Sequence, residues 1–269
     1  MSNAMEREQP KLRREQTEIW AIKASGLDVS RLASLDTQAS LPIQATVVDS
    51  VAVLPLHGVL IDGEPFWSDE ISYDSVAISA AKLTADSAIK AIVLDINSPG
   101  GSAYGAIETA RLLASLAQAK PIVSLGRGLM ASAAYMLALG AGGGIWSTPS
   151  TEVGSIGVLV PVYDVSGWMA QQGVTVELFT SGPLKGTGFP GTQLSAAQRA
   201  ALQQLANSYA DIFFEWVSSR RPAAALEVFD GGTYVGETAG EMGLINGVIG
   251  GLGEAIDFAR RLTASPPGV

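Results

Sequence analysis

From residue 51 onward, short β-branched apolar runs alternate with amphipathic stretches at helical spacing. The apolar runs predict strands over 51–56, 88–96 and 122–125, and the amphipathic stretches predict helices over 73–84 and 103–119. Strands separated by helices predict an α/β fold with a parallel sheet. The runs 91–94 and 158–160 are almost wholly apolar, so we expect both to lie inside a sheet that is covered on both faces.

The second half of the chain continues less regularly. We expect a helix at 164–172, a strand at 175–180, a Gly/Pro loop at 181–192, a long helix at 195–220 and a short closing unit at 232–261. We expect residues 1–4 to be an expression scar, 5–45 an N-terminal arm, 46–262 a single α/β domain and 263–269 a flexible tail. No repeat with a fixed period is present in the sequence.

One uncharged segment, 128–151, is long enough to span a bilayer. Four glycines at 140 and 142–144 interrupt it, which leaves only a short apolar helix at 133–139. We therefore expect a buried core helix here and no membrane partner.

The composition of the chain excludes several classes of partner and of site. The formal net charge of −9 argues against nucleic acid as a partner, because nucleic-acid binding depends on clustered Lys and Arg. The chain has no cysteine, which excludes disulfides, thiolate metal sites and a cysteine nucleophile.

Two glycine-containing turns are candidates for chemistry. The first, 97–102, reads Asn-Ser-Pro-Gly-Gly-Ser and joins a predicted strand to a helix, where backbone N–H groups can receive negative charge. In isolation, its paired glycines equally indicate an ordinary tight turn. The second places Ser132 at the start of the apolar helix. That serine is either an N-cap or a nucleophile beside N–H groups that can hold an oxyanion.

Lys185 lies among small and apolar residues. Between Glu177 and Asp211 the only other charged residue is Arg199. A lysine with a pKa of about 10.4 is protonated at neutral pH and cannot accept a proton. Burial without a carboxylate partner lowers that pKa, and the local sequence fits a dry pocket. An ordinary surface lysine is the alternative when the residue is considered alone.

These three motifs, in this order, resemble the S49 peptidase family, which includes signal peptide peptidase A and the head-maturation proteases of tailed phages called capsid assembly protein C. The resemblance covers roughly 51–250. The stretches that support it are 51–58 (VAVLPLHG), 92–101 (IVLDINSPGG), 153–158 (VGSIGV) and 239–245 (AGEMGLI).

The resemblance implies a serine endopeptidase with a Ser-Lys dyad. Ser132 would be the nucleophile, Lys185 the general base and Ser155 the residue that orients the lysine amine. The backbone amides of Gly100, Gly101 and Ala133 would form or flank the oxyanion hole. The reaction would proceed through an acyl-enzyme and would need no metal or other cofactor.

The resemblance also implies a Clp protease/crotonase-like spiral fold, assembled as a homo-oligomer. It suggests protein substrates such as phage scaffold or capsid proteins, in the cytoplasm of a bacterial host. The family's membrane-anchored branch has an N-terminal transmembrane helix that this sequence lacks, which favours the phage or prophage branch. Some phage relatives carry a scaffold segment after the catalytic domain, so we expect the scaffold to be a separate chain or the sequence to be truncated.

Several alternatives remain open. A Ser-His-Asp triad would have to use His57, the only histidine, which we expect to be structural. A crotonase-like acyl-CoA enzyme would share the oxyanion hole but use a carboxylate. A signal-peptide-peptidase-like enzyme that degrades peptides, or a catalytically silent phage head component, would keep the fold. We interpret Asp95 and Glu152 as strand-end or loop charges without a catalytic role.

Overall fold

The computed structural model describes residues 43–65 and 67–264. The expected scar, the arm except for its last three residues, and the tail beyond residue 264 lie outside the described residues. The described chain forms two compact units, one of residues 43–158 with 207–264 and one of residues 159–206. We call them the sheet unit and the 159–206 unit and describe each by itself.

The sheet unit has a mixed sheet of eight strands among its described residues. These strands are β1 (Thr46–Val48), β2 (Val51–His57), β5 (Ala91–Ser98), β6 (Ile122–Ala131), β7 (Ile145–Ser147), β8 (Glu152–Gly154), β9 (Thr233–Val235) and β10 (Gly247–Val248). β3 (Val59–Ile61) and β4 (Glu70–Ser72) form a separate two-stranded sheet.

The main sheet has the strand order β1-β2-β5-β6-β7-β10, with β8 pairing to β6 and β9 to β8. The pairs β2–β5, β5–β6, β6–β7, β6–β8 and β7–β10 are parallel, whereas β1–β2 and β8–β9 are antiparallel. The prediction of an α/β fold with a mainly parallel sheet is confirmed. In such sheets, functional groups gather where the strands end, at their carboxyl edge.

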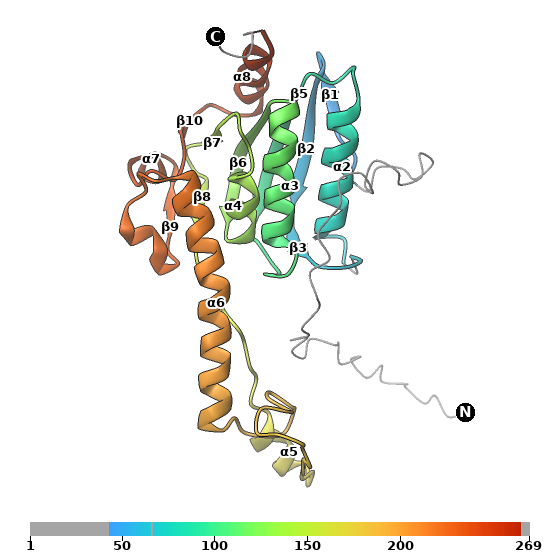
Figure 1. The fold of residues 1–269 in the computed structure, drawn as a ribbon, viewed down its shortest axis with the longest axis vertical. Helices are drawn as coiled ribbons and strands as arrows, with labels where there is room; N and C mark the ends of the chain where they lie inside the picture. Colours follow the sequence, from blue (N-terminus) through green and yellow to red (C-terminus); the bar gives the residue numbers. More distant parts are fainter. Residues whose placement is uncertain (1–42, 66, 265–269) are drawn as a thin grey trace, which may run out of the picture. The chain divides into compact units, whose positions relative to one another are not determined.

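Helices cover both faces of this sheet. On one face lie α2 (Tyr73–Ala85), α3 (Ala106–Ala119) and α4 (Ala133–Ala138), seen in front of the strands in Figure 1. The C-terminal part of α6 (Ala196–Arg220) and α7 (Gly236–Glu241) belong to the same core. On the other face α8 (Leu252–Ala264) packs against the alternate residues of β2, β5 and β6. This two-sided burial explains why the first four residues of β5, 91–94, are all apolar.

Most predicted elements of the sheet unit are confirmed, although several ends differ, such as those of the strand predicted at 88–96 and observed at 91–98. The first helix after the Gly-Gly turn begins at Ala106 and not at residue 103, because Gly105 adopts a left-handed conformation directly before it. The third strand was expected to end at residue 125, before a glycine loop, but β6 continues to Ala131. The glycines at 126 and 128 lie inside the strand, where β6 is bulged.

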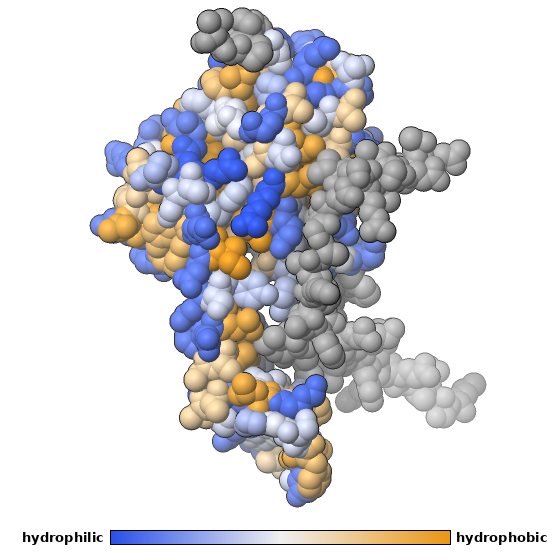
Figure 2. All heavy atoms as spheres, viewed as in Figure 1, coloured by the Kyte–Doolittle hydropathy of each residue, from blue (hydrophilic) through white to orange (hydrophobic). Residues whose placement is uncertain are grey.

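The 159–206 unit contains the short helix α5 (Ser166–Gln171) and the start of α6. The predicted strands at 158–160 and 175–180 are wrong, because neither segment pairs with a strand among the described residues, and Leu159 is 79% exposed. None of the described residues 159–206 is buried. Apolar side chains lie on its surface, as the region around α5 in Figure 2 shows. Apolar content indicates that a segment needs a covering surface, but not that a sheet provides it.

Candidate active site

Backbone strain marks two serines of the sheet unit. Four non-glycine residues in the described ranges have a positive φ, and two of them, Asp49 and Ser50, form the tight turn between β1 and β2. The other two are Ser132 and Ser155, with φ of 53° and 51°. Positive φ is unfavourable for a residue with a Cβ, and strained residues of this kind cluster at functional sites.

Ser132 lies at the junction between β6 and α4. Its φ of 53° and ψ of −125° make a sharp strand-to-helix turn, the backbone geometry that is also found at nucleophile elbows. Ser132 is the N-cap residue of α4, but its hydroxyl makes no capping hydrogen bond, so capping does not explain the choice of serine. Its backbone N–H donates to the carbonyl of Gly154 at 2.8 Å, which ties the turn to the end of β8.

Ser155 lies beside Ser132. The parallel register of β6 and β8 ends at the pair Ala131 and Gly154, and the two serines are the next residue of each strand. The N–H of Ser155 donates to the carbonyl of Gly232 at 2.7 Å, which holds its strained backbone in place. Two half-buried serines therefore share one end of the sheet.

The Gly100-Gly101 turn approaches Ser132 closely. A Cβ on Gly100 would come within 2.8 Å of the Cβ of Ser132 and of the amide nitrogen of Ala133, so only glycine fits there. The N–H of Gly100 donates to Ser98 Oγ at 3.1 Å. By contrast, the N–H groups of Gly101 and Ala133 have no acceptor among the described residues.

The small sheet and helix α2 hold this turn. Leu60 of β3 donates its N–H to the Gly100 carbonyl and accepts from the N–H of Ser102, both at 2.8 Å. The Tyr73 hydroxyl donates to the Ser102 carbonyl at 2.6 Å, and burial raises the pKa of that phenol well above its usual range. A neutral donor at Tyr73 therefore anchors the turn at every pH where the protein would work.

Lys185 belongs to the 159–206 unit. Its side chain is exposed, so the expectation that its neighbours in the sequence form a dry pocket is wrong for this unit by itself. The small and apolar residues around it form a series of turns and do not enclose it. Pairing of Lys185 with Ser132 thus stays a prediction.

His57, Asp95 and Arg127 form a polar cluster on the sheet unit. Asp95 is 3% exposed and accepts from Arg127 Nε at 2.6 Å and from Arg127 Nη2. His57 Nε2 lies 3.1 Å from Asp95 Oδ2. Among the described residues no hydrogen bond joins His57 to Ser132 or Ser155. The interpretation of Asp95 as a plain strand-end charge is wrong, because it is buried within β5 and paired.

A comparison with known protein families identifies the family of this chain. The model of peptidase family S49 matches residues 114–264, which is more than half of the chain and includes Ser132, Ser155 and Lys185. The chain belongs to peptidase family S49. The resemblance inferred from its motifs is therefore confirmed.

Curated relatives include phage and cellular members of family S49. The head-tail preconnector protein GP5 of Enterobacteria phage P21 is 34% identical over 64% of this chain and 35% of its own length. The Enterococcus faecium protein named for signal peptide peptidase SppA is 30% identical over 78% of this chain and 63% of its own length. Capsid assembly protease C of Escherichia phage lambda is 28% identical over 76% of this chain and 47% of its own length. The chain thus spans about one third to two thirds of the length of these relatives.

Sequence reasoning about this S49 chain missed the contacts around β6. Asp95, Asn97, Arg127 and Thr151 hold the strand just before the serine turn. Asp95 carried a signal, because a charged residue within an apolar run needs a buried partner. Glu152 is the exposed first residue of β8 and accepts from the Thr233 hydroxyl at 3.1 Å, in keeping with its interpretation as a strand-end charge.

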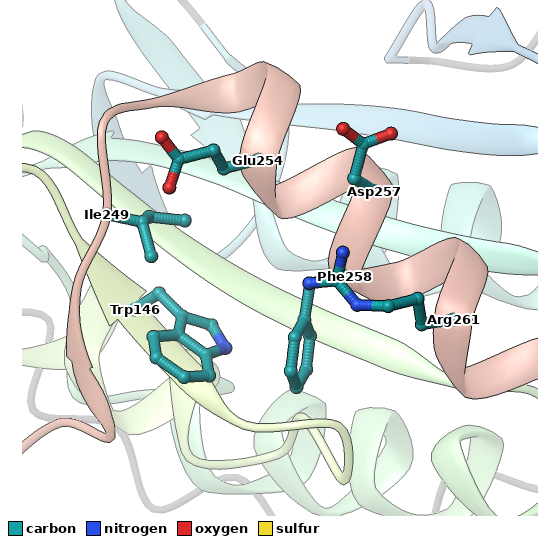
Figure 3. A pocket seen from close by; sticks show the side chains of 6 residues that line it. All are labelled: Trp146, Ile249, Glu254, Asp257, Phe258 and Arg261. Atoms are coloured by element: carbon teal, nitrogen blue, oxygen red, sulfur yellow. The ribbon is translucent and has the colours of Figure 1, made fainter.

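The pocket in Figure 3 is a separate feature of this S49 chain. It has a volume of about 300 Å³ and lies between β7 and α8, lined by Trp146, Ile249, Glu254, Asp257, Phe258 and Arg261. None of the predicted site residues lines it. The described residues contain no group of three or more His, Asp or Glu side chains arranged to hold a metal ion. They also contain no helix that is long and apolar enough to cross a membrane.

Proposed function

We propose that this chain is a serine endopeptidase in which Ser132 is the nucleophile and Lys185 the general base. The observation that carries the proposal is the strained Ser132 turn, flanked by the unbonded N–H groups of Gly101 and Ala133. A strained serine with unbonded N–H groups in the adjoining turns suits acyl transfer, which needs donors for the oxyanion. Membership of family S49 supports the same chemistry.

In this mechanism neutral Lys185 takes the proton of Ser132, and the resulting alkoxide attacks the carbonyl carbon of the scissile peptide. The oxyanion accepts hydrogen bonds from the N–H groups of Gly101 and Ala133. Gly100 supports the turn through its bond to Ser98 and is not a donor in this proposal. Lys185 then donates the proton to the leaving amine, and water hydrolyses the acyl-enzyme. Loss of one such donor typically costs about 100-fold in rate.

The lysine must be neutral to act. Lowering its pKa by about 3 units costs about 4 kcal/mol, which burial has to supply. Since Lys185 is exposed in the 159–206 unit, its burial depends on surfaces outside that unit. Ser155 is proposed to orient the lysine amine, because it shares the strand end with Ser132.

The proposed assembly is a homo-oligomer with a Clp protease/crotonase-like spiral fold and a single catalytic domain over 46–262. Exposed apolar side chains of the 159–206 unit support association, because soluble monomers rarely leave such groups uncovered. The transfer of β6 from β7 to β8, together with the small β3–β4 sheet, supports a sheet that curls in the way a spiral needs.

The substrates are proposed to be proteins, and the proposed role is phage or prophage capsid maturation in a bacterial cytoplasm. The phage relatives named for a head-tail preconnector and a capsid assembly protease support this role. A second candidate is a signal-peptide-peptidase-like enzyme that degrades peptides. The SppA relative favours it, because that match covers more of both chains.

The test is hydrolysis of casein and of peptides between pH 6 and 10 by the wild type, Ser132→Ala, Lys185→Met and His57→Ala. We expect the first two variants to lose at least about 1,000-fold in kcat/KM and His57→Ala to keep most of it. Circular dichroism of each variant controls for folding. Full activity of Lys185→Met would exclude the dyad, and loss in Ser132→Ala and His57→Ala but not in Lys185→Met would indicate a Ser-His triad.

A further inference from the structure

Strand β6 changes its neighbour part-way along. Its residues Ser124–Gly126 pair with β7, and its residues Leu129–Ala131 pair with β8. On the other edge, Gly126 pairs with Ile96 of β5, whereas Met130 pairs with Ser98. Asn97 alone therefore faces residues 127–129, and β6 carries a bulge at the point where it changes neighbours.

Each of the three bulge residues is held by a different side chain. Arg127 forms its two-point ion pair with Asp95. The N–H of Gly128 donates to Thr151 Oγ1 at 3.3 Å, and the N–H of Leu129 donates to Asn97 Oδ1 at 3.2 Å. Side chains thus supply acceptors for two backbone N–H groups of the bulge, and the third residue is held through its own side chain.

Gly128 shows how tightly the bulge is packed. It has a φ of 102°, and a Cβ there would lie 2.7 Å from Asn97 Oδ1. Thr151 is fully buried and also donates to the Gly126 carbonyl at 2.9 Å, so it bonds on both sides of Arg127. The bulge is a fixed piece of backbone, specified by side chains from β5 and from the loop before β8.

The Asp95–Arg127 pair is the strongest of these contacts. Asp95 is almost wholly buried, so its charge has to be paired, and a two-point bond to a guanidinium fixes direction as well as distance. The same carboxylate raises the pKa of Arg127 through that hydrogen bond. Because Arg127 lies five residues before Ser132 along β6, a shift of this pair moves the strand that leads into the serine turn.

We propose that Asp95, Asn97 and Thr151 are positioning residues that set the conformation of Ser132 through the Arg127–Leu129 bulge. The bulge directs the end of β6 to β8, where the Gly154 carbonyl accepts from the N–H of Ser132. Without it the strand would continue beside β7, and the strained serine would lose the bond that holds it. This inference rests on the proposed role of Ser132 as the nucleophile.

The test compares Asp95→Asn and Asn97→Ala with Asp49→Asn in the full chain. Asp49→Asn is the matched control. Asp49 precedes β2 in the same unit, and its carboxylate lies 2.9 Å from Arg260 Nη2, so the substitution breaks an ion pair away from the bulge. Asn97 is exposed, so its truncation leaves the core intact even if Asp95→Asn folds poorly. The readouts are kcat and KM for peptide hydrolysis, the rate of labelling by a fluorophosphonate, and crystal structures of the variants.

We expect Asp95→Asn and Asn97→Ala to lower kcat and the labelling rate by about tenfold to a hundredfold, with KM within about twofold of wild type. The control Asp49→Asn should match the wild type in kcat and in the labelling rate. A role in stability alone would leave the labelling rate of the folded protein unchanged. In the crystal structures we expect the φ of Ser132 to leave its positive value.

The crystal structures separate this inference from the proposed function. A Ser132 that keeps its positive φ and its bond to Gly154 in both variants would overturn the positioning role, whatever the rates. A wild type that neither hydrolyses peptides nor reacts with the fluorophosphonate would overturn the proposed function instead.

Discussion

At the scale of single residues, the site depends on backbone conformations that side-chain chemistry does not favour. Ser132 and Ser155 carry a strain of about 1–3 kcal/mol each, and neighbouring carbonyls at Gly154 and Gly232 offset it. Buried tyrosines supply other fixed points. Tyr73 donates to the Gly-Gly turn, and Tyr135 of α4 donates to the Leu244 carbonyl at 2.7 Å.

The raised pKa values of these two tyrosines imply that the free energy of unfolding falls at alkaline pH. Burial raises the pKa of both Tyr73 and Tyr135, so each keeps its proton in the folded state after it would lose it in the unfolded state. Their contribution is therefore complete below about pH 10 and falls by about 1.4 kcal/mol per residue for each pH unit above it.

Urea unfolding between pH 8 and 11 tests this expectation. Tyr135→Phe should lower the free energy of unfolding at pH 8 by about 1–3 kcal/mol, because the Leu244 carbonyl loses its donor. The same substitution should make the free energy of unfolding fall less steeply with pH above about pH 10. The control is Tyr163→Phe, at a tyrosine that is 77% exposed. Equal slopes for Tyr135→Phe and the wild type would contradict the assignment.

At the scale of elements, short strands and turns build the site around the long parallel strands. β3 is only three residues long, yet it bonds to both sides of Gly101. A Cβ on Gly101 would lie 1.8 Å from the Leu60 carbonyl oxygen, so the turn and β3 cannot keep their spacing around any other residue. The turn and the small sheet therefore act as one element.

Gly101→Ala should thus lower the free energy of unfolding more than an alanine substitution at a glycine whose Cβ position is empty. Gly251 is the matched control, because its φ of 150° is close to the 159° of Gly101 and no atom lies within 4 Å of its Cβ position. We expect Gly101→Ala to lose about 2 kcal/mol more than Gly251→Ala in chemical denaturation, because the backbone of β3 must shift. Equal losses of unfolding free energy in the two variants would show that glycine is needed at residue 101 for its φ alone, and not for the contact with β3.

At the scale of the whole molecule, two units of different character carry the proposed dyad. The sheet unit has an extensive buried core, whereas the 159–206 unit has no buried residue among those described. Its exposed apolar side chains include Tyr163 at 77%, Trp168 at 62% and Phe179 at 94%. Apolar side chains of this kind are usually covered by another surface, and we propose that a second copy of the chain covers them.

Trp168→Ser combined with Phe179→Ser should therefore weaken self-association. We expect the dissociation constant from sedimentation velocity to rise by at least about tenfold, because aromatic anchors dominate interface energies. Leu226→Ser is the matched control, since Leu226 is 84% exposed on the sheet unit. Identical sedimentation of all three proteins would exclude a role for this surface in assembly.

The sequence by itself determined the alternation of strands and helices, the two glycine turns and the family. These features depend on local periodicity and on short motifs, which neighbours in the chain specify. Even so, the apolar run 158–160 was misread as a strand, because periodicity records a need for burial and not the surface that meets it.

Only the tertiary structure decided how the serine turn is built. The pairing of β6 with β8 placed Ser155 beside Ser132, and the bulge made Asp95 a buried partner of Arg127. These contacts join residues far apart in the chain, so no local pattern encodes them. Strand register is set by the balance of many weak contacts across the sheet, which forms only when the whole unit folds.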